Sequence, residues 1–111
     1  MKTAVIGNRD FNDYEKLKQA LSQFKISVLV SGGAKGADTL AERYADEHGI
    51  EKEIIKPDYK SFGKSAIFIR NREIVEKCER LIAFWNGKPG GTEYTIKHAD
   101  KKNKEITIIR I

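Results

Sequence analysis

Apolar, strand-like runs alternate with amphipathic helical segments along the whole chain, and this alternation limits its possible folds more than any other feature. The predicted strands are Thr3–Ile6, Val28–Val30, Glu53–Lys56, Leu81–Trp85 and Ile106–Ile109. Parallel strands need crossover connections, and right-handed crossovers place helices on both faces of a sheet. We therefore predict an α/β fold, a single Rossmann-like three-layer sandwich that occupies residues 1–111 as one domain. Its five-stranded parallel sheet should have the order 3-2-1-4-5, with helices on both faces.

Four helices are predicted between these strands, because apolar residues recur there at positions three and four apart. The first should begin after Asn12 as its N-cap, and the second at Ala37. The third should follow Ser65 as its N-cap and run to about Glu79, and the fourth should begin near Thr92.

The third predicted helix carries a polar residue on its apolar face. Asn71 lies four residues after Ile67 and three before Ile74. A buried polar side chain costs free energy unless it finds hydrogen-bond partners. Two interpretations stay open: Asn71 satisfies the backbone of a nearby loop, or it faces a ligand together with its neighbour Arg70.

Composition narrows the choice of partners and compartment. The chain has 21 Lys and Arg against 16 Asp and Glu, and its net charge of +5 favours an anionic partner such as a nucleotide or nucleic acid. A single cysteine, Cys78, and the isolated His48 and His98 predict neither a disulfide nor a metal site. No apolar run approaches the length of a membrane span, and Met1 leads directly into a strand-like segment. We therefore expect a cytoplasmic protein with no membrane partner.

The segment SGGAKGAD, from Ser31 to Asp38, joins the second predicted strand to the second helix. Gly32, Gly33 and Gly36 have no Cβ atom, so the backbone can take positive φ and a ligand can approach the amides closely. The helix adds unpaired N–H groups and the positive end of its dipole. Two interpretations stay open here as well: an anion-binding turn, or an ordinary tight connection between strand and helix.

Three loops should meet at one edge of the predicted sheet. In the order 3-2-1-4-5 the winding reverses between the first and fourth strands, and ligands bind at this switch point beyond the carboxyl ends of the strands. The loops Gly7–Asp10, Ser31–Asp38 and Trp85–Thr92 all lie there. Because each is rich in glycine or polar groups, they predict a site for an anionic ligand.

Two common nucleotide-binding motifs do not fit the sequence. The segment Gly63 to Ser65 looks like the end of a P-loop, but the place of the required upstream glycine is taken by Asp58. The glycines between Ser31 and Gly36 do not have the GxGxxG spacing, and no acidic residue ends the second strand. We expect no NAD site and no cofactor.

Nearly the whole chain resembles the YspA, cpYpsA-related branch of the SLOG superfamily. The resemblance rests on the turn Gly7 to Phe11, on SGGAKGAD, on PDYKSFGKSAIFIRNRE from Pro57 to Glu73 and on LIAFWNGKPGGT from Leu81 to Thr92. This superfamily groups the DNA-processing Smf/DprA proteins with the Lonely Guy phosphoribohydrolases, which share a Rossmann-like fold. The resemblance implies a pocket for a nucleotide or a nucleotide-derived ligand such as an ADP-ribose or cyclic nucleotide signal. A role in phage or defence signalling is one version of this function.

The resemblance also assigns residues to the pocket. Arg9 matches the basic residue after the first strand, and Arg70 and Asn71 match the family's RN pair. Asp38 is expected either to hold the first glycine turn or to meet a sugar hydroxyl. The predicted ligand-binding residues are Gly7, Arg9, Ser31, Gly32, Gly33, Gly36, Asp38, Arg70, Asn71, Trp85, Gly90, Gly91 and Thr92.

Two other functions stay open. One is hydrolysis of the N-glycosidic bond of a nucleoside monophosphate, for which Arg70 and Glu93 would be the catalytic residues. Lonely Guy enzymes look like PGGxGTxxE, whereas Glu93 follows Thr92 directly. A helix turns about 100° per residue, so Glu93 should point away from the place of that acid, and we favour binding without hydrolysis. The other is a DNA-binding role like that of DprA, although the dispersed positive charge predicts weak or no binding to nucleic acid.

The third predicted helix also suggests self-association. Phe68 and Ile69 lie off its buried face and widen its apolar surface. Because SLOG relatives commonly assemble through helices beside the pocket, we expect a homodimer or a larger homo-oligomer.

Overall fold

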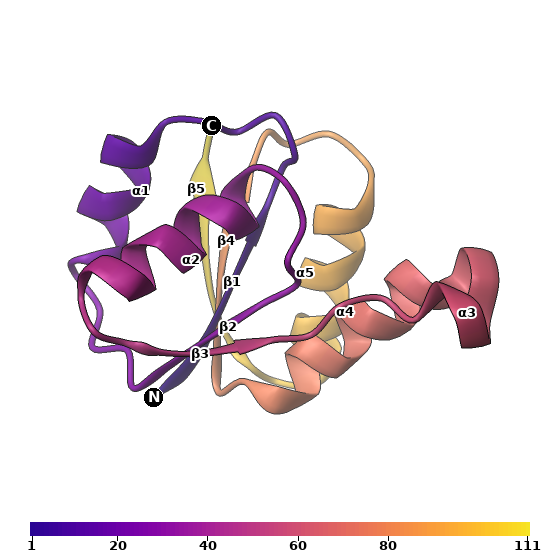
Figure 1. Cartoon of the computed structure of the whole chain (residues 1–111). Coiled ribbons are helices and arrows are strands. Elements are labelled where there is room, and N and C mark those ends of the chain that lie inside the picture. The colour runs from indigo at the N-terminus through magenta and orange to yellow at the C-terminus, as the bar shows by residue number, and fades with distance from the viewer.

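The strands form one parallel sheet in the order β3-β2-β1-β4-β5 in the computed structural model, which describes residues 1–111 (Figure 1). The strands are β1 (Lys2–Gly7), β2 (Val28–Ser31), β3 (Glu51–Ile54), β4 (Arg80–Trp85) and β5 (Glu105–Arg110). β1 lies in the middle of the sheet and pairs with β2 on one side and β4 on the other. The predicted strand number, direction and order are confirmed, and the predicted switch point lies at the carboxyl end of β1.

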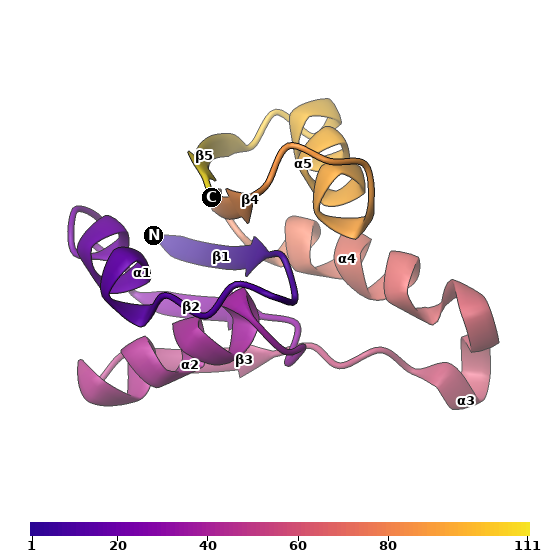
Figure 2. The same ribbon diagram turned by 90° about the horizontal axis from the view of Figure 1, so that it is seen from above.

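Each face of the sheet has its own hydrophobic core. Successive residues of a strand point to opposite faces, and accordingly Val5 belongs to one core whereas Ala4 and Ile6 belong to the other. The main helices are α1 (Tyr14–Leu21), α2 (Ala37–Glu47), α4 (Ala66–Lys77) and α5 (Gly91–Lys101). α1 and α2 cover the first face, and α4 and α5 cover the second (Figure 2). The predicted three layers are therefore confirmed.

The first helix begins one residue later than predicted. Asp13, not Asn12, is its N-cap, because the Asp13 carboxylate accepts a hydrogen bond from the Lys16 amide at 3.1 Å. Both residue types are good caps. The prediction was wrong because a sequence with two suitable neighbours does not show which of them faces the open amides.

The third strand lies two residues before its predicted place. β3 begins at Glu51, and the predicted segment Glu53–Lys56 overlaps it only in part. β3 is an edge strand that pairs with β2 alone, so Glu51 and Lys52 can point their charged side chains to solvent. The prediction relied on apolar residues, and an exposed edge strand does not need them.

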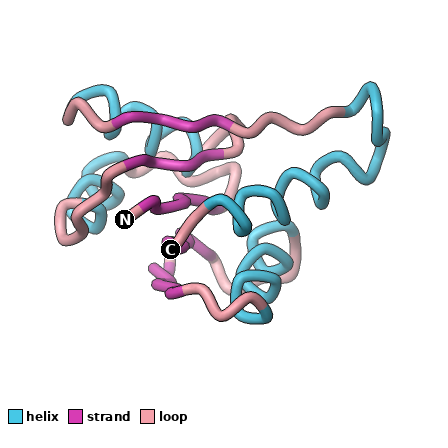
Figure 3. The backbone as a smooth tube through the Cα atoms, turned by 90° about the horizontal axis from the view of Figure 1, so that it is seen from below, coloured by secondary structure: helices cyan, strands magenta, loops and turns pink.

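A short helical segment occupies part of the predicted loop before the third helix. It consists of α3 (Tyr59–Phe62) and the 3₁₀ turn η1 (Gly63–Ser65), and neither contains a buried residue. Asp58 caps α3 by accepting a hydrogen bond from the Ser61 amide at 3.1 Å. Figure 3 shows that this segment carries the chain away from the sheet before α4 returns to it.

None of the helices has both the length and the apolar character needed to cross a lipid bilayer.

Candidate functional site

A cavity of about 630 Å³ opens at the carboxyl edge of the sheet, where the sequence predicted a switch-point site. Its volume lies in the range typical of small-molecule sites. The loops after β1, β2 and β4 contribute to it, as predicted, and so do α4, α5 and the loop after β3. The cavity walls carry the cations of Arg9, Lys56, Arg70 and Lys88 against the carboxylates of Asp10 and Asp38.

Most of the predicted ligand-binding residues line this cavity. They are Gly7, Arg9, Gly32, Gly33, Asp38, Arg70, Asn71, Gly90, Gly91 and Thr92. Their contact with a ligand stays a prediction. Residues from four separate segments of the chain therefore surround one cavity.

Three predicted residues do not line the cavity but hold its loops in place. Ser31 is fully buried, and its hydroxyl donates a hydrogen bond to the Glu42 carboxylate at 3.0 Å. Trp85 donates from Nε1 to the Lys88 carbonyl at 2.9 Å, which folds the loop after β4. Gly36 has a φ of +83°, and a Cβ there would collide with the Asn8 carbonyl oxygen.

Other polar residues also line the cavity. Asn8, Asp10 and Lys88 lie in the predicted loops but were not singled out, and Lys56, Tyr59 and Thr95 lie outside those loops. Asn8 accepts a hydrogen bond from the Asn86 amide at 2.9 Å, which ties the loop after β1 to the loop after β4. Lys56 and Tyr59 follow the carboxyl end of β3. Applying the switch-point argument to that strand end as well would have found them.

The first glycine turn uses its own side chains to satisfy its amides. Asp38 Oδ2 accepts hydrogen bonds from the Gly32 amide at 3.2 Å and from the Ala34 amide at 3.3 Å. The Gly33 amide lies 3.3 Å from Ser31 Oγ, its acceptor. These amides therefore already have acceptors. Of the two interpretations left open for Asp38, holding the turn is the one that its hydrogen bonds support.

Asp38 is a buried carboxyl group, with 6% of its surface exposed. Burial raises its pKa to about 6, although the Ala34 and Gly32 amides and the nearby Arg70 guanidinium act in the opposite direction. Its second oxygen, Oδ1, has no hydrogen-bond partner within the protein. Asp38 therefore changes charge near neutral pH while it lines the cavity.

Arg70 and Asn71 form a connected polar pair on α4, and each is only 8% exposed. Arg70 donates from Nη1 to the Gly32 carbonyl and from Nε to Asn71 Oδ1, the latter at 2.8 Å. Burial lowers the pKa of Arg70, and the Asp38 carboxylate opposes this shift. The Nη2 group of Arg70 has no acceptor in the protein, so it is free to donate into the cavity.

The side-chain amide of Asn71 points toward the start of α5. A Cβ placed on Gly91 would lie 3.8 Å from Asn71 Nδ2, and this nitrogen has no acceptor in the protein. The earlier alternative, in which Asn71 satisfies a loop backbone, is not what the structure shows. Its oxygen accepts from Arg70, and its nitrogen faces the cavity wall at Gly91.

The N-terminus of α5 lacks a side-chain cap. Gly90 is the N-cap residue and has no side chain, so the first amides of the helix find no protein acceptor. Gly90, Gly91 and Thr92 line the cavity, and Lys88 lies just before them. Unpaired amides, the helix dipole and a nearby cation suit this end of the cavity to an anion.

Glu93 does not line the cavity. Its Oε1 lies 3.5 Å from Lys97 Nζ, one turn further along α5. The carboxylate is therefore directed along the helix surface, which agrees with the direction expected from its place next to Thr92.

The fold and the cavity define a Rossmann-like α/β protein with an open pocket at its switch point. The sequence profile of the YspA, cpYpsA-related SLOG family matches residues 1–62, and the chain belongs to this family. The resemblance seen in the sequence is thereby confirmed. SLOG proteins form a nucleotide-binding superfamily.

Known proteins that are similar to this chain include one from a phage and one from a bacterium. The Gene 61 protein of Mycobacterium phage D29 is 34% identical over 80 residues, which cover 67% of this chain and 64% of the phage protein. The X-ray structure of DNA processing protein A (DprA) from Streptococcus pneumoniae matches with a TM-score of 0.84 and 20% identity, and covers 99% of this chain and 50% of that chain. The chain thus spans less than two thirds of either relative, and the DprA match shows the fold alone.

Proposed function

We propose that this protein binds a nucleotide or a nucleotide-derived ligand in the cavity at the carboxyl edge of its sheet. The observation that carries the proposal is the Arg70–Asn71 pair, which lines the cavity with two donors, Arg70 Nη2 and Asn71 Nδ2, that have no acceptor in the protein. A phosphate oxygen is a suitable acceptor for these donors, and a hydrogen bond from the Arg70 guanidinium to it is charge-assisted. Membership of a nucleotide-binding superfamily supports the same ligand class.

The charge of the cavity agrees with this ligand class. Arg9, Arg70, Lys56 and Lys88 outnumber the two carboxylates that line it, so an anion is attracted. A signalling nucleotide, such as an ADP-ribose or cyclic nucleotide derivative, belongs to this class. The phage relative makes a role in phage or defence signalling one version of the proposal.

We further propose that the ligand is bound and not hydrolysed. N-glycosidic hydrolysis requires an acid or base within hydrogen-bond reach of the reacting atoms. Glu93, the carboxylate that the resemblance offers for this role, pairs with Lys97 and lies outside the cavity lining.

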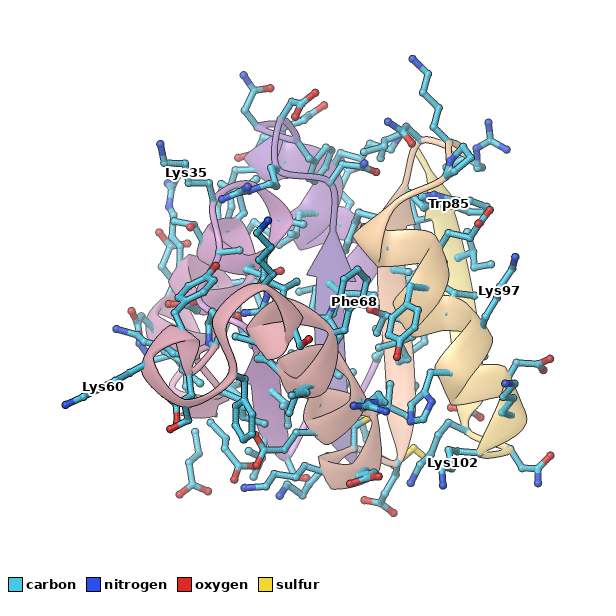
Figure 4. The ribbon with its side chains drawn as sticks, turned by 90° about the vertical axis from the view of Figure 1, so that its right-hand side faces the viewer. Lys35, Lys60, Phe68, Trp85, Lys97 and Lys102 are labelled. Atoms are coloured by element: carbon cyan, nitrogen blue, oxygen red, sulfur yellow. The ribbon has the colours of Figure 1, made fainter.

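Nucleic acid is a weaker candidate. The structural relative is named as a DNA processing protein, but the basic residues here do not form one stripe. Figure 4 shows Lys35, Lys60, Lys97 and Lys102 pointing outward from separate parts of the surface. Binding to DNA should therefore be weak and should fall steeply with added salt.

A ligand survey tests the proposal. Protein purified without added ligand is denatured and its supernatant analysed by mass spectrometry. The same protein is titrated by calorimetry with the four common mononucleotides, ADP-ribose and cyclic dinucleotides. We expect saturable binding of at least one of these compounds. No copurifying nucleotide together with no binding by any of them would contradict the proposal.

A further inference from the structure

Residues 56–65 lie between β3 and α4 and contribute no side chain to either hydrophobic core. We infer that this segment is a lid, which closes over a bound nucleotide and places the ring of Tyr59 against it. The inference rests on the proposed function, and it names the part of the protein that responds to the ligand.

The lid segment is firmly anchored only at its two ends. Ile55, just before it, is 8% exposed, and its amide donates a hydrogen bond to the Ser31 carbonyl at 2.8 Å. Ala66, just after it, is 1% exposed. No residue from 56 to 65 is buried, and Pro57 alone is half-buried. A segment with so few buried contacts moves at a much lower free-energy cost than the cores on which its ends are fixed.

The helix within the lid segment has little to hold it in one place. α3 is four residues long, and an isolated helix needs about 12–15 residues to be even marginally stable in water. It projects from the body of the protein (Figure 2). Gly63, which follows it, has a φ of +55°, and a Cβ there would meet nothing within 4 Å. The surroundings of Gly63 therefore leave the segment room to turn about this residue.

Tyr59 provides the contact between the lid segment and the ligand. It lines the cavity, yet 57% of its surface is exposed, so the protein covers only part of its ring. The ring lies near Arg70, because burial lowers the pKa of Arg70 whereas Asp38 and Tyr59 act in the opposite direction. Exposed aromatic rings provide a stacking surface for any nucleobase. A nucleotide in the cavity would cover the part of the ring that the protein leaves open.

The charge of the lid segment is opposite to that of a nucleotide. Residues 56–65 contain three Lys and one Asp, which gives a net charge of +2. An anion in the cavity therefore attracts the segment. A ligand shifts a lid toward its closed state only if it interacts more favourably with that state, and the Tyr59 ring and the lysine charges supply this difference.

The alternative is a fixed segment, in which Lys56 and Tyr59 touch the ligand from their present positions. The two alternatives differ at Lys60 and Lys64, which are exposed and do not line the cavity. With a fixed segment, ligand binding leaves the backbone around both lysines as it is. With a closing lid, ligand binding restrains that backbone and makes it a poorer substrate for a protease.

Limited proteolysis with trypsin tests the lid. The probes are the four common nucleoside monophosphates, ADP-ribose and cyclic di-AMP, each used at saturation where calorimetry detects binding. Initial rates are read by mass spectrometry of the released peptides. A bound probe should slow cleavage after Lys60 and Lys64 about 5- to 150-fold, the usual range for coupling between binding and a conformational change. Cleavage after Lys102, at the far end of α5, is the internal control and should not change (Figure 4).

Two variants test the role of Tyr59. Tyr59→Ala should bind the same probe more weakly and, even when saturated, should lose most of the protection at Lys60 and Lys64. Phe62→Ala is the matched control, because Phe62 lies on the same helix and is 49% exposed but does not line the cavity. It should keep the affinity and the protection of the wild type.

The outcomes separate the lid from the proposed function. A probe that binds the wild type without slowing cleavage after Lys60 and Lys64 would overturn the lid and leave nucleotide binding intact. So would equal slowing after Lys102, which shows general stabilisation, or full protection in Tyr59→Ala. If calorimetry detects no binding of any probe, the proposed function fails and the lid with it.

Discussion

The guanidinium of Arg70 donates a hydrogen bond to the carbonyl oxygen of Gly32, which joins the middle of α4 to the turn after β2. A Cβ on Gly32 would lie 2.5 Å from Arg70 Nη1 and 2.9 Å from Asp38 Oδ2. Glycine at this position leaves room for the arginine. The turn after β2 thus acts as a support that orients Arg70, while the free donors of the cavity lie on α4 and α5.

Gly36 and Gly49 should respond differently to substitution by alanine. Both have positive φ, which costs a residue with a Cβ about 1–2 kcal/mol. Gly49 has open space around it, whereas a Cβ on Gly36 would lie 2.5 Å from the Arg9 carbonyl oxygen. We expect Gly49→Ala to lose about that amount of unfolding free energy and Gly36→Ala clearly more. Urea denaturation of both variants measures these losses of unfolding free energy. Equal losses would contradict the close packing of Gly36 against the loop after β1.

The stability of the protein should depend on pH through Asp38. Its pKa is raised from 3.8 to about 6 in the folded protein, so the folded state holds the proton more tightly than the unfolded chain. Stability from this group is therefore greatest below pH 4, falls as the pH rises to about 6 and is constant above that. The shift corresponds to about 3 kcal/mol.

The matched variant for this prediction is Asp38→Asn, which does not titrate and keeps an oxygen acceptor for the amides. Unfolding free energies of both proteins are measured in urea between pH 4 and pH 7. The wild type should lose stability relative to Asp38→Asn across this interval. Parallel curves would show that Asp38 titrates normally.

Glu93→Gln should have no effect on nucleotide chemistry, because the wild type itself should not release free base. The measurement is chromatography of adenosine, guanosine, cytidine and uridine monophosphates after incubation with each protein. Turnover by the wild type that disappears in Glu93→Gln would establish a glycosidase and contradict binding without hydrolysis.

The surface of α4 should mediate self-association. Phe68 is 47% exposed, and its ring packs edge-to-face on Tyr94 of α5 with centroids 5.0 Å apart, at the junction seen in Figure 4. We expect a homodimer or larger assembly that Phe68→Lys weakens, because a charge replaces an apolar contact. Ile108→Lys, at an exposed residue of the edge strand β5, serves as the control. A wild type that remains monomeric in light scattering at high concentration would contradict this prediction.

The sequence was most informative where burial is strongest. The runs that became β1, β2 and β4 are buried, so their apolar pattern predicted these strands, and the order came from the arrangement that is common in such folds. The apolar pattern did not predict the bounds of β3 or the presence of α3. Both elements are largely exposed, so their sequences show no apolar periodicity.

The site residues were predicted better than their roles. Glycine spacing indicated a turn at Ser31 to Asp38 but not the direction of its amides, which depends on where the Asp38 carboxylate lies in three dimensions. The helix pattern placed Asn71 on a buried face, but only the structure shows that Arg70 satisfies its oxygen and leaves its nitrogen free. Local sequence carries no signal for such contacts between distant segments.

A nucleotide should bind through the Arg70 donors, and Arg72 on the same helix offers a matched control because it is exposed. The most direct measurement is calorimetry of the wild type, Arg70→Ala and Arg72→Ala with the best ligand from the survey. Loss of a charge-assisted hydrogen bond costs about 1.5–3 kcal/mol, so Arg70→Ala should bind about 10- to 150-fold more weakly. Arg72→Ala should bind like the wild type. Equal affinity of all three proteins, with Arg70→Ala still folded, would contradict the account.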